Sequence, residues 1–320
     1  ALEGKLPSGF GGLSMEYKQE WLQVPTPAYV VEESLLRRNL EILAGLQRET
    51  GAHILLAQKA FSMFHFYPLV AEYLSGATAS GLYEARLAHE EMPGRENHIF
   101  SPAYRSEDFA EIVEICDHIV FNSFAQWEKF GPMALAKGRE CGLRINPEHS
   151  TQDHAIYDPC SPESRLGIRR AAFQPEKLAG ISGRHFPPLC EQNADALAET
   201  LQAVERGFGE FLPQMKWINF GGGHHITRED YDLELLKSCI GHMQDTYGLE
   251  VYIEPGEAVA LNAGWLVSTV LEIVENEKPV AVLDTSAACH MPDVIEMPYR
   301  PPVVSSAEPG VKPYTYMLAG

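Results

Sequence analysis

A lysine follows a short apolar run in the first quarter of the chain. The run His53–Ala57 is continuously apolar after its first residue, as in a buried parallel strand, and Gln58, Lys59 and Ala60 come next. At the end of such a strand, burial would disfavour the charged ammonium group and lower the pKa of Lys59. Lys59 would then be a nucleophile able to form a Schiff base. The alternative is an ordinary lysine that reaches solvent from the rim of the fold.

Three later strand-like segments also end in residues that could do chemistry. His185 could stack on a planar ring or transfer a proton, or it could be a structural histidine. Gly221, Gly222 and Gly223 form either a plain tight turn or a turn whose backbone N–H groups approach a phosphate. Glu254 could act as a base, ligate a metal, pair with a protonated ring nitrogen, or bond to a neighbouring loop.

The two histidines that follow the glycines could suggest a metal ion. His224 and His225 are adjacent, so their side chains point in different directions, and no carboxylate has the spacing of a zinc-binding helix. We expect no metal site in this protein. A later segment holds Cys289 and His290 close to Asp293 and Glu296, and it could be a plain polar loop.

The four strand-end features together describe one site. They offer an amine nucleophile, a ring-stacking histidine, a phosphate-binding turn and an acid for a ring nitrogen. Pyridoxal 5'-phosphate requires these groups from a protein. The sequence therefore predicts a pyridoxal-phosphate site.

Such a site requires a fold that brings strand ends together. Eight candidates for buried strands begin near residues 53, 76, 98, 118, 141, 180, 216 and 250, and one helical segment separates most neighbours. This alternation predicts a (β/α)8 barrel of the TIM type, with its active site at the carboxyl ends of the strands. An open doubly wound sheet is the alternative, but no GxGxxG motif follows the first strand.

The sequence changes character after the last barrel strand. From Trp265 on, strand-like segments follow one another without helices, and six prolines follow His290. We therefore expect the barrel to span residues 28–262. Residues 15–27 and 263–320 would form a β-rich domain that lacks its C-terminal part. We interpret residues 1–14, which are Gly-rich and precede Met15, as an added leader.

Composition excludes several classes of protein. Of the 320 residues, 45% are hydrophobic and 22% charged, as in globular proteins. The formal net charge of −19 argues against a nucleic-acid partner but does not repel polyamines or other small cations. No apolar run is long enough to predict a membrane helix. The six cysteines form no CxxC pair, as expected for free thiols in the reducing cytoplasm.

The order of these motifs resembles that of the fold type III pyridoxal-phosphate decarboxylases, which have an alanine racemase-like fold and include ornithine and diaminopimelate decarboxylases. Residues 189–192, 254–258 and 289–301 resemble the carboxynorspermidine (carboxyspermidine) decarboxylase branch. The resemblance covers about residues 27–320. It implies a barrel followed by a β-domain, and decarboxylation of carboxynorspermidine and carboxyspermidine to norspermidine and spermidine.

The resemblance also implies roles for individual residues. By motif match, Lys59 would carry the cofactor, His185 would stack on its ring and Glu254 would pair with the ring nitrogen. The three glycines would bind its phosphate, and Arg165 matches a family arginine near the cofactor. That arginine could instead form a salt bridge that closes its loop.

The substrate and the assembly follow from the same resemblance. The remote amines of a carboxylated polyamine require acidic partners, and the candidates by motif position are Glu191, Asp293 and Glu296. The family implies a homodimer with active sites at the subunit interface. It also implies a catalytic cysteine and an acidic residue in a segment beyond Gly320, so Cys289 is not that cysteine.

Two positions depart from the pattern of many relatives. Glu257 stands where they carry an arginine that contacts the phosphate, and Thr78 where several carry an aspartate. The phosphate would then depend more on glycine amides and hydroxyl groups. Both differences fit the carboxynorspermidine branch rather than the ornithine branch.

Two other functions remain open at this point. The first is that of a diaminopimelate decarboxylase or another amino-acid decarboxylase of this fold. Diaminopimelate would require an arginine for its second carboxylate in place of the acids. A non-catalytic pyridoxal-phosphate-binding barrel is the other, although the β-rich domain argues against it.

Overall fold

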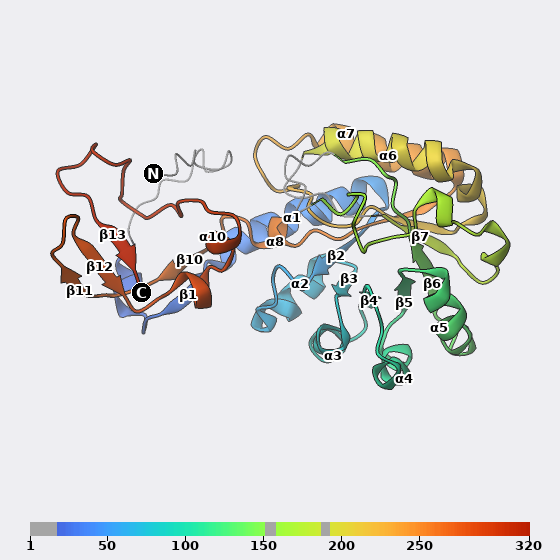
Figure 1. Cartoon of the computed structure of the whole chain (residues 1–320), viewed down its shortest axis with the longest axis horizontal. Helices are drawn as coiled ribbons and strands as arrows, with labels where there is room; N and C mark the ends of the chain where they lie inside the picture. Colours follow the sequence, from blue (N-terminus) through green and yellow to red (C-terminus); the bar gives the residue numbers. More distant parts are fainter. Residues whose placement is uncertain (1–17, 151–157, 187–192) are drawn as a thin grey trace. The chain divides into compact units, whose positions relative to one another are not determined.

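Eight parallel strands form a closed barrel in the computed structural model, which describes residues 18–150, 158–186 and 193–320 (Figure 1). The strands follow chain order, and β2 pairs with β9 to close the barrel. They are β2 (His53–Ala57), β3 (Gly76–Ala79), β4 (Glu96–Phe100), β5 (His118–Phe121), β6 (Glu140–Arg144), β7 (Gly183–His185), β8 (Trp217–Asn219) and β9 (Glu250–Ile253). The predicted barrel is confirmed, and the open sheet is excluded.

Helices surround the barrel and connect its strands (Figure 1). They are α1 (Glu33–Thr50), α2 (Tyr67–Tyr73), α3 (Leu82–Glu91), α4 (Ser106–Ile115), α5 (Phe124–Ala136), α6 (Ala194–Phe208), α7 (Leu233–Tyr247) and α8 (Glu257–Ala260). Short 3-10 helices are Gln19–Gln23, Phe64–Phe66, Arg170–Ala172, Pro175–Lys177 and Gly209–Gln214. In α1, Leu36, Leu40 and Leu43 are buried because their spacing places them on one helix face. No helix in the described ranges is both long and apolar enough to span a membrane.

The middle of the barrel is filled by large side chains. Leu55, Val120, Trp217 and Tyr252 come from four different strands and pack together as one buried cluster. Glycines make room for the indole: a Cβ atom on Gly183 would lie 1.9 Å from the Trp217 ring. Because this layer is packed, polar chemistry is confined to the two ends of the strands.

The residues flanking the barrel form a separate unit, which comprises Asn262–Gly320 and the described residues before Leu36. It contains β1 (Ala28–Val31) paired antiparallel with β10 (Gly264–Val267), and a sheet of β11 (Val270–Val274), β12 (Val280–Leu283) and β13 (Met317–Ala319). Two short helices, α9 (Ala287–His290) and α10 (Asp293–Glu296), follow β12. Residues 28–31, at which we expected the barrel domain to begin, therefore pair with a strand of this second unit.

Candidate active site

Polar side chains from neighbouring strands meet at the carboxyl end of the barrel. His185 ends β7, Asn219 ends β8, and Glu254 follows directly after β9. The two oxygens of Glu254 accept hydrogen bonds from different partners: Oε2 from His185 Nε2 at 3.0 Å, and Oε1 from Asn219 Nδ2 at 2.9 Å. Two residues that sequence analysis considered separately thus lie in direct contact.

The surroundings of Glu254 keep its carboxyl group ionised. Burial alone would raise the pKa, but attraction to His185 and hydrogen bonds from His185 and Thr78 lower the pKa of Glu254 from 4.5 to about 2. Burial lowers the pKa of His185. At neutral pH the pair is therefore a carboxylate hydrogen-bonded to a neutral imidazole N–H. The carboxylate can also accept a hydrogen bond from a protonated ring nitrogen of a ligand.

A buried arginine that sequence analysis missed lies beside this pair. Arg144 ends β6, and its guanidinium lies 4.3 Å above the ring of Phe100, which stacks on His185 at 5.5 Å. Its Nε and Nη2 atoms are buried without a hydrogen-bond partner among the described residues. Burial lowers its pKa to about 10, so the group stays charged at neutral pH. The available signal was the one used for Lys59, a basic residue that closes a barrel strand.

The glycine-rich loop begins immediately after β8. Gly221 and Gly223 have φ angles of 70° and 75°, which a residue with a side chain rarely adopts. The Asn219 side chain accepts a hydrogen bond from the Gly221 N–H at 2.8 Å, and the Gly221 carbonyl accepts one from the Glu254 N–H at 2.9 Å. The loop that could hold a phosphate is thus joined directly to the carboxylate.

Lys59 lies in the turn after β2, beside the chain that follows Glu254. The Ala57 N–H donates to the Pro255 carbonyl at 3.1 Å, and a Cβ atom on Gly256 would lie 2.4 Å from that of Ala60. The Lys59 side chain itself is exposed. Of the two possibilities that the sequence left open, exposure agrees with a lysine that reaches solvent, since β2 ends at Ala57, two residues before Lys59.

The remaining predicted site residues make contacts of their own. Arg165 is exposed, and its backbone carbonyl accepts a hydrogen bond from Asn122 at 2.9 Å. Asp293 and Glu296 are exposed in α10 of the other unit, where Asp293 accepts a hydrogen bond from Tyr299 at 2.7 Å. Glu191 lies outside the described residues.

The two adjacent histidines after the glycines have different contact partners. His224 is buried, and its Nε2 lies 3.2 Å from the Phe220 carbonyl. His225 Nε2 lies 3.1 Å from a carboxylate oxygen of Glu257. Glu257 thus holds a neighbouring histidine at the base of the loop.

Comparison with known proteins identifies relatives over most of the chain. No protein-family model matches it. The chain is 46% identical over 284 residues to a carboxynorspermidine/carboxyspermidine decarboxylase of Campylobacter jejuni, covering 89% of this chain and 74% of the relative. It is 41% identical over 299 residues to a carboxyaminopropylagmatine decarboxylase of Synechocystis, covering 93% and 77%.

A solved structure has a similar sequence identity to this chain. Carboxynorspermidine decarboxylase from Campylobacter jejuni, complexed with norspermidine, matches with a TM-score of 0.80 and 47% identity over 86% of this chain and 72% of that one. Diaminopimelate decarboxylase from Helicobacter pylori matches with a TM-score of 0.77 but only 17% identity, so this second match bears on the fold alone.

Proposed function

Because the chain belongs to the carboxynorspermidine/carboxyspermidine decarboxylase family, we propose that it decarboxylates a carboxylated polyamine at a pyridoxal phosphate bound at the carboxyl end of the barrel. The observation that carries the proposal is the buried Glu254 carboxylate, with its lowered pKa, next to the glycine-rich loop. A carboxylate in that position matches the pyridinium nitrogen of the cofactor, and the loop matches its phosphate.

The residues present fit this cofactor. Gly221 and Gly223 offer a turn in which no Cβ atom hinders an anion, and Arg144 has a charged, buried guanidinium with unused N–H groups within the described part of the chain. His185 Nδ1 is likewise buried without a partner, and the ring can stack on a planar ligand once it exchanges its contact with Glu254. A ligand that combines an anionic group, a planar ring and a basic ring nitrogen would satisfy these groups together.

Each residue of the cluster would have a separate task. When bound, pyridoxal phosphate supplies an electron sink for the electron pair that remains on Cα as carbon dioxide leaves. Glu254 would hold a proton at the pyridine nitrogen, which that sink requires. Lys59 would provide the amine for covalent attachment from its turn beside Pro255. His185 would orient the ring, with Arg165 near the cofactor.

The substrate would combine an α-amino acid end with a cationic tail. The two relatives at 46% and 41% identity are named for carboxynorspermidine or carboxyspermidine and for carboxyaminopropylagmatine, and all of these molecules carry positive charge remote from the carboxylate. A protein with a net charge of −19 attracts such tails. Glu191, Asp293 and Glu296 are the proposed partners, and the similarity to the Synechocystis enzyme makes the agmatine derivative a second candidate substrate.

The assembly and its location belong to the same proposal. We expect a homodimer with active sites at the subunit interface, located in the cytoplasm. The expected partner is the small substrate, without nucleic acid or membrane. Sedimentation of the purified enzyme would test the dimer: a monomer that retains full activity would contradict it.

Product analysis tests the function directly. The enzyme is incubated with carboxynorspermidine, carboxyspermidine, carboxyaminopropylagmatine and diaminopimelate, and the released carbon dioxide and amine products are measured. We expect norspermidine or spermidine as the main product and no lysine. Turnover of diaminopimelate without any polyamine product would contradict the proposal.

Trapping of the cofactor tests the lysine. Borohydride reduction should join pyridoxal phosphate to the peptide that contains Lys59. The substitution Lys59→Ala should abolish both the trapped cofactor and carbon dioxide release. Lys129→Ala, which removes an exposed lysine bonded to Ser106, is the matched control and should change neither.

A further inference from the structure

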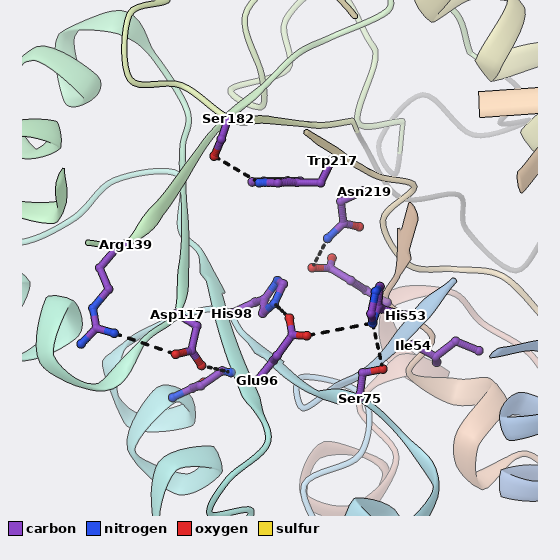
Figure 2. A network of polar contacts seen from close by, with 12 residues as sticks. His53, Ile54, Ser75, Glu96, His98, Asp117, Arg139, Ser182, Trp217 and Asn219 are labelled. Atoms are coloured by element: carbon purple, nitrogen blue, oxygen red, sulfur yellow. Dashed lines mark hydrogen bonds and ion pairs between the residues drawn. The ribbon is translucent and has the colours of Figure 1, made fainter. Parts of the chain in front are cut away.

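A second cluster of titratable side chains lies inside the barrel at the opposite, amino-terminal end of the strands. Glu96 is the first residue of β4, His98 lies two positions later, and His118 is the first residue of β5. Alternate residues of a strand face the same side, and His98 is the register partner of His118, so all three side chains gather in one place. Figure 2 shows the Glu96 carboxylate between the rings of His98 and His53.

The distances within the cluster are short. Glu96 Oε2 lies 2.7 Å from His98 Nε2, and one ligand atom from each of Glu96, His98 and His118 lies within 4.8 Å of the other two. The rings of His98 and His118 stack with their centroids 4.0 Å apart. His118 is only 8% exposed, and in the described ranges its Nδ1 is buried without a hydrogen-bond partner. A buried imidazole nitrogen with a free lone pair is costly unless something binds it.

The cluster also offers donor atoms of the kinds that bind a cation. Burial lowers the pKa of His118 to about 2. Burial would raise the pKa of Glu96, but the hydrogen bond and attraction from His98 leave it lowered, so the group is a carboxylate. Two imidazoles and a carboxylate are the donor set of many zinc sites.

Neighbouring groups would support the ligands and admit an ion. His53 Nδ1 lies 4.0 Å from Glu96 Oε1 and 3.4 Å from Ser75 Oγ, so it can orient the second oxygen of the carboxylate (Figure 2). About a third of the Glu96 side chain is exposed. Glu96 also lines a surface cavity of about 540 Å³, so this one ligand residue borders solvent.

We propose that Glu96, His98 and His118 form a binding site for one divalent transition-metal ion of the zinc class. Tetrahedral ligands at about 2.1 Å from the metal lie about 3.4 Å apart. Glu96 Oε2 and His98 Nε2, now 2.7 Å apart, would therefore separate slightly to admit the ion, and the ligand atom of His118 lies within 4.8 Å of both. The rings of His98 and His118 would turn out of their stack to direct their nitrogen atoms at the ion. The rings of His98 and His118 pack against Tyr252 and Trp217 of the central cluster.

Zinc binding to the tag-free holoenzyme tests this site. Equilibrium dialysis against zinc chloride, followed by metal analysis, should give one tightly held ion per chain. Glu96→Gln and His118→Asn should each weaken binding at least about tenfold in competition with a chromophoric chelator. An anomalous difference map at the zinc edge should place the ion between β4 and β5.

Two controls separate this site from surface binding. His242→Asn removes an exposed histidine that pairs with Glu205 at 2.7 Å, and Cys289→Ser removes an exposed thiol. Neither should change the affinity. If His118→Asn does not fold, the zinc affinity of Glu96→Gln alone tests the proposal. Glu96 lies at the edge of the barrel and its side chain is partly exposed, so this substitution should leave the fold intact. Absence of bound zinc, binding unchanged in Glu96→Gln, or an anomalous peak elsewhere would overturn the proposal.

Discussion

The barrel holds a glutamate–histidine pair at each of its two ends, and the two pairs have almost the same internal geometry. Glu254 lies 3.0 Å from His185 at the carboxyl end, and Glu96 lies 2.7 Å from His98 at the amino end. Their surroundings differ. The first pair is joined to a glycine-rich loop, whereas the second is packed against stacked rings. The pair by itself therefore does not define an active site; the groups around it do.

Large apolar and aromatic side chains fill the middle of the barrel between its two ends. Trp217, Tyr252, Leu55 and Val120 pack there as one buried cluster. One end can bind an anionic cofactor while the other offers ligands for a cation. The predictions below change one end, or the layer between them, and use the rest of the molecule as control.

The largest effect is expected at the carboxyl end. Glu254→Gln keeps the shape of the side chain but cannot hold a proton at the pyridine nitrogen, so the rate of decarboxylation should fall on the order of 10³-fold. The measurement is kcat for carbon dioxide release from carboxynorspermidine. A fall of less than about threefold would show that Glu254 does not act on the cofactor.

The matched control uses a third glutamate–histidine pair, on the outer helices. Glu205 in α6 lies 2.7 Å from His242 in α7 and also accepts a hydrogen bond from Tyr247. Glu205→Gln removes the same charge from a similar pair remote from the strand ends. Its kcat should equal that of the unmodified enzyme.

Sequence analysis located the carboxyl end of the barrel because its signals are local. Glu254 and the glycines follow directly after apolar strands, and strand carboxyl ends meet in any barrel. The amino-terminal cluster had no such signal. His98 and His118 are twenty residues apart in sequence, and only the register of β4 with β5 makes them partners.

Other features depend on long-range pairing or on local turn geometry. The pairing of Ala28–Val31 with Gly264–Val267 joins segments more than 200 residues apart, which no local pattern indicates. The exposure of Lys59 depends on where β2 ends, and the apolar run does not specify the direction of the following turn. Asn219 was missed because an asparagine at a strand end has no distinctive pattern until its partner, Glu254, is known.

Acid should distinguish Glu254 from other carboxyl groups. Its pKa is lowered from 4.5 to about 2 in the folded state, so its contribution to stability is fully present above pH 4.5 and is lost as the pH falls toward 2. By about pH 3 the loss should reach about 2 kcal/mol. Urea unfolding of the cofactor-free protein between about pH 6 and pH 3 measures it.

The variant Glu254→Gln should lose correspondingly less stability over that range, because it has no carboxylate to protonate. Glu205→Gln should lose as much as the unmodified protein. Parallel curves for Glu254→Gln and the unmodified protein would mean that the surroundings of Glu254 do not stabilise its charge.

Adding one methyl group at a glycine should disturb the packed cluster around Trp217 in the middle of the barrel. A Cβ atom on Gly183 would lie 1.9 Å from the Trp217 ring, and one on Gly142 would lie 2.4 Å from it. Gly183→Ala should therefore displace the indole and lower the free energy of unfolding by about 1–3 kcal/mol. Urea denaturation with Trp fluorescence measures this. Unchanged stability would mean that the indole is not confined by β6 and β7.

The smallest effect has the opposite sign and comes from the outer layer. Gly241 lies in the middle of α7, where a Cβ atom would meet nothing within 4 Å. Gly241→Ala should raise the free energy of unfolding by about 0.5–1 kcal/mol, because alanine loses less backbone entropy on folding and favours the helix. The same urea measurement compares it with Gly183→Ala. The chemical change is identical at the two positions. Changes of opposite sign in the free energy of unfolding would therefore show that crowding inside the barrel causes the lost stability of Gly183→Ala. Destabilisation by both substitutions would show instead that added side chains are not tolerated at either position.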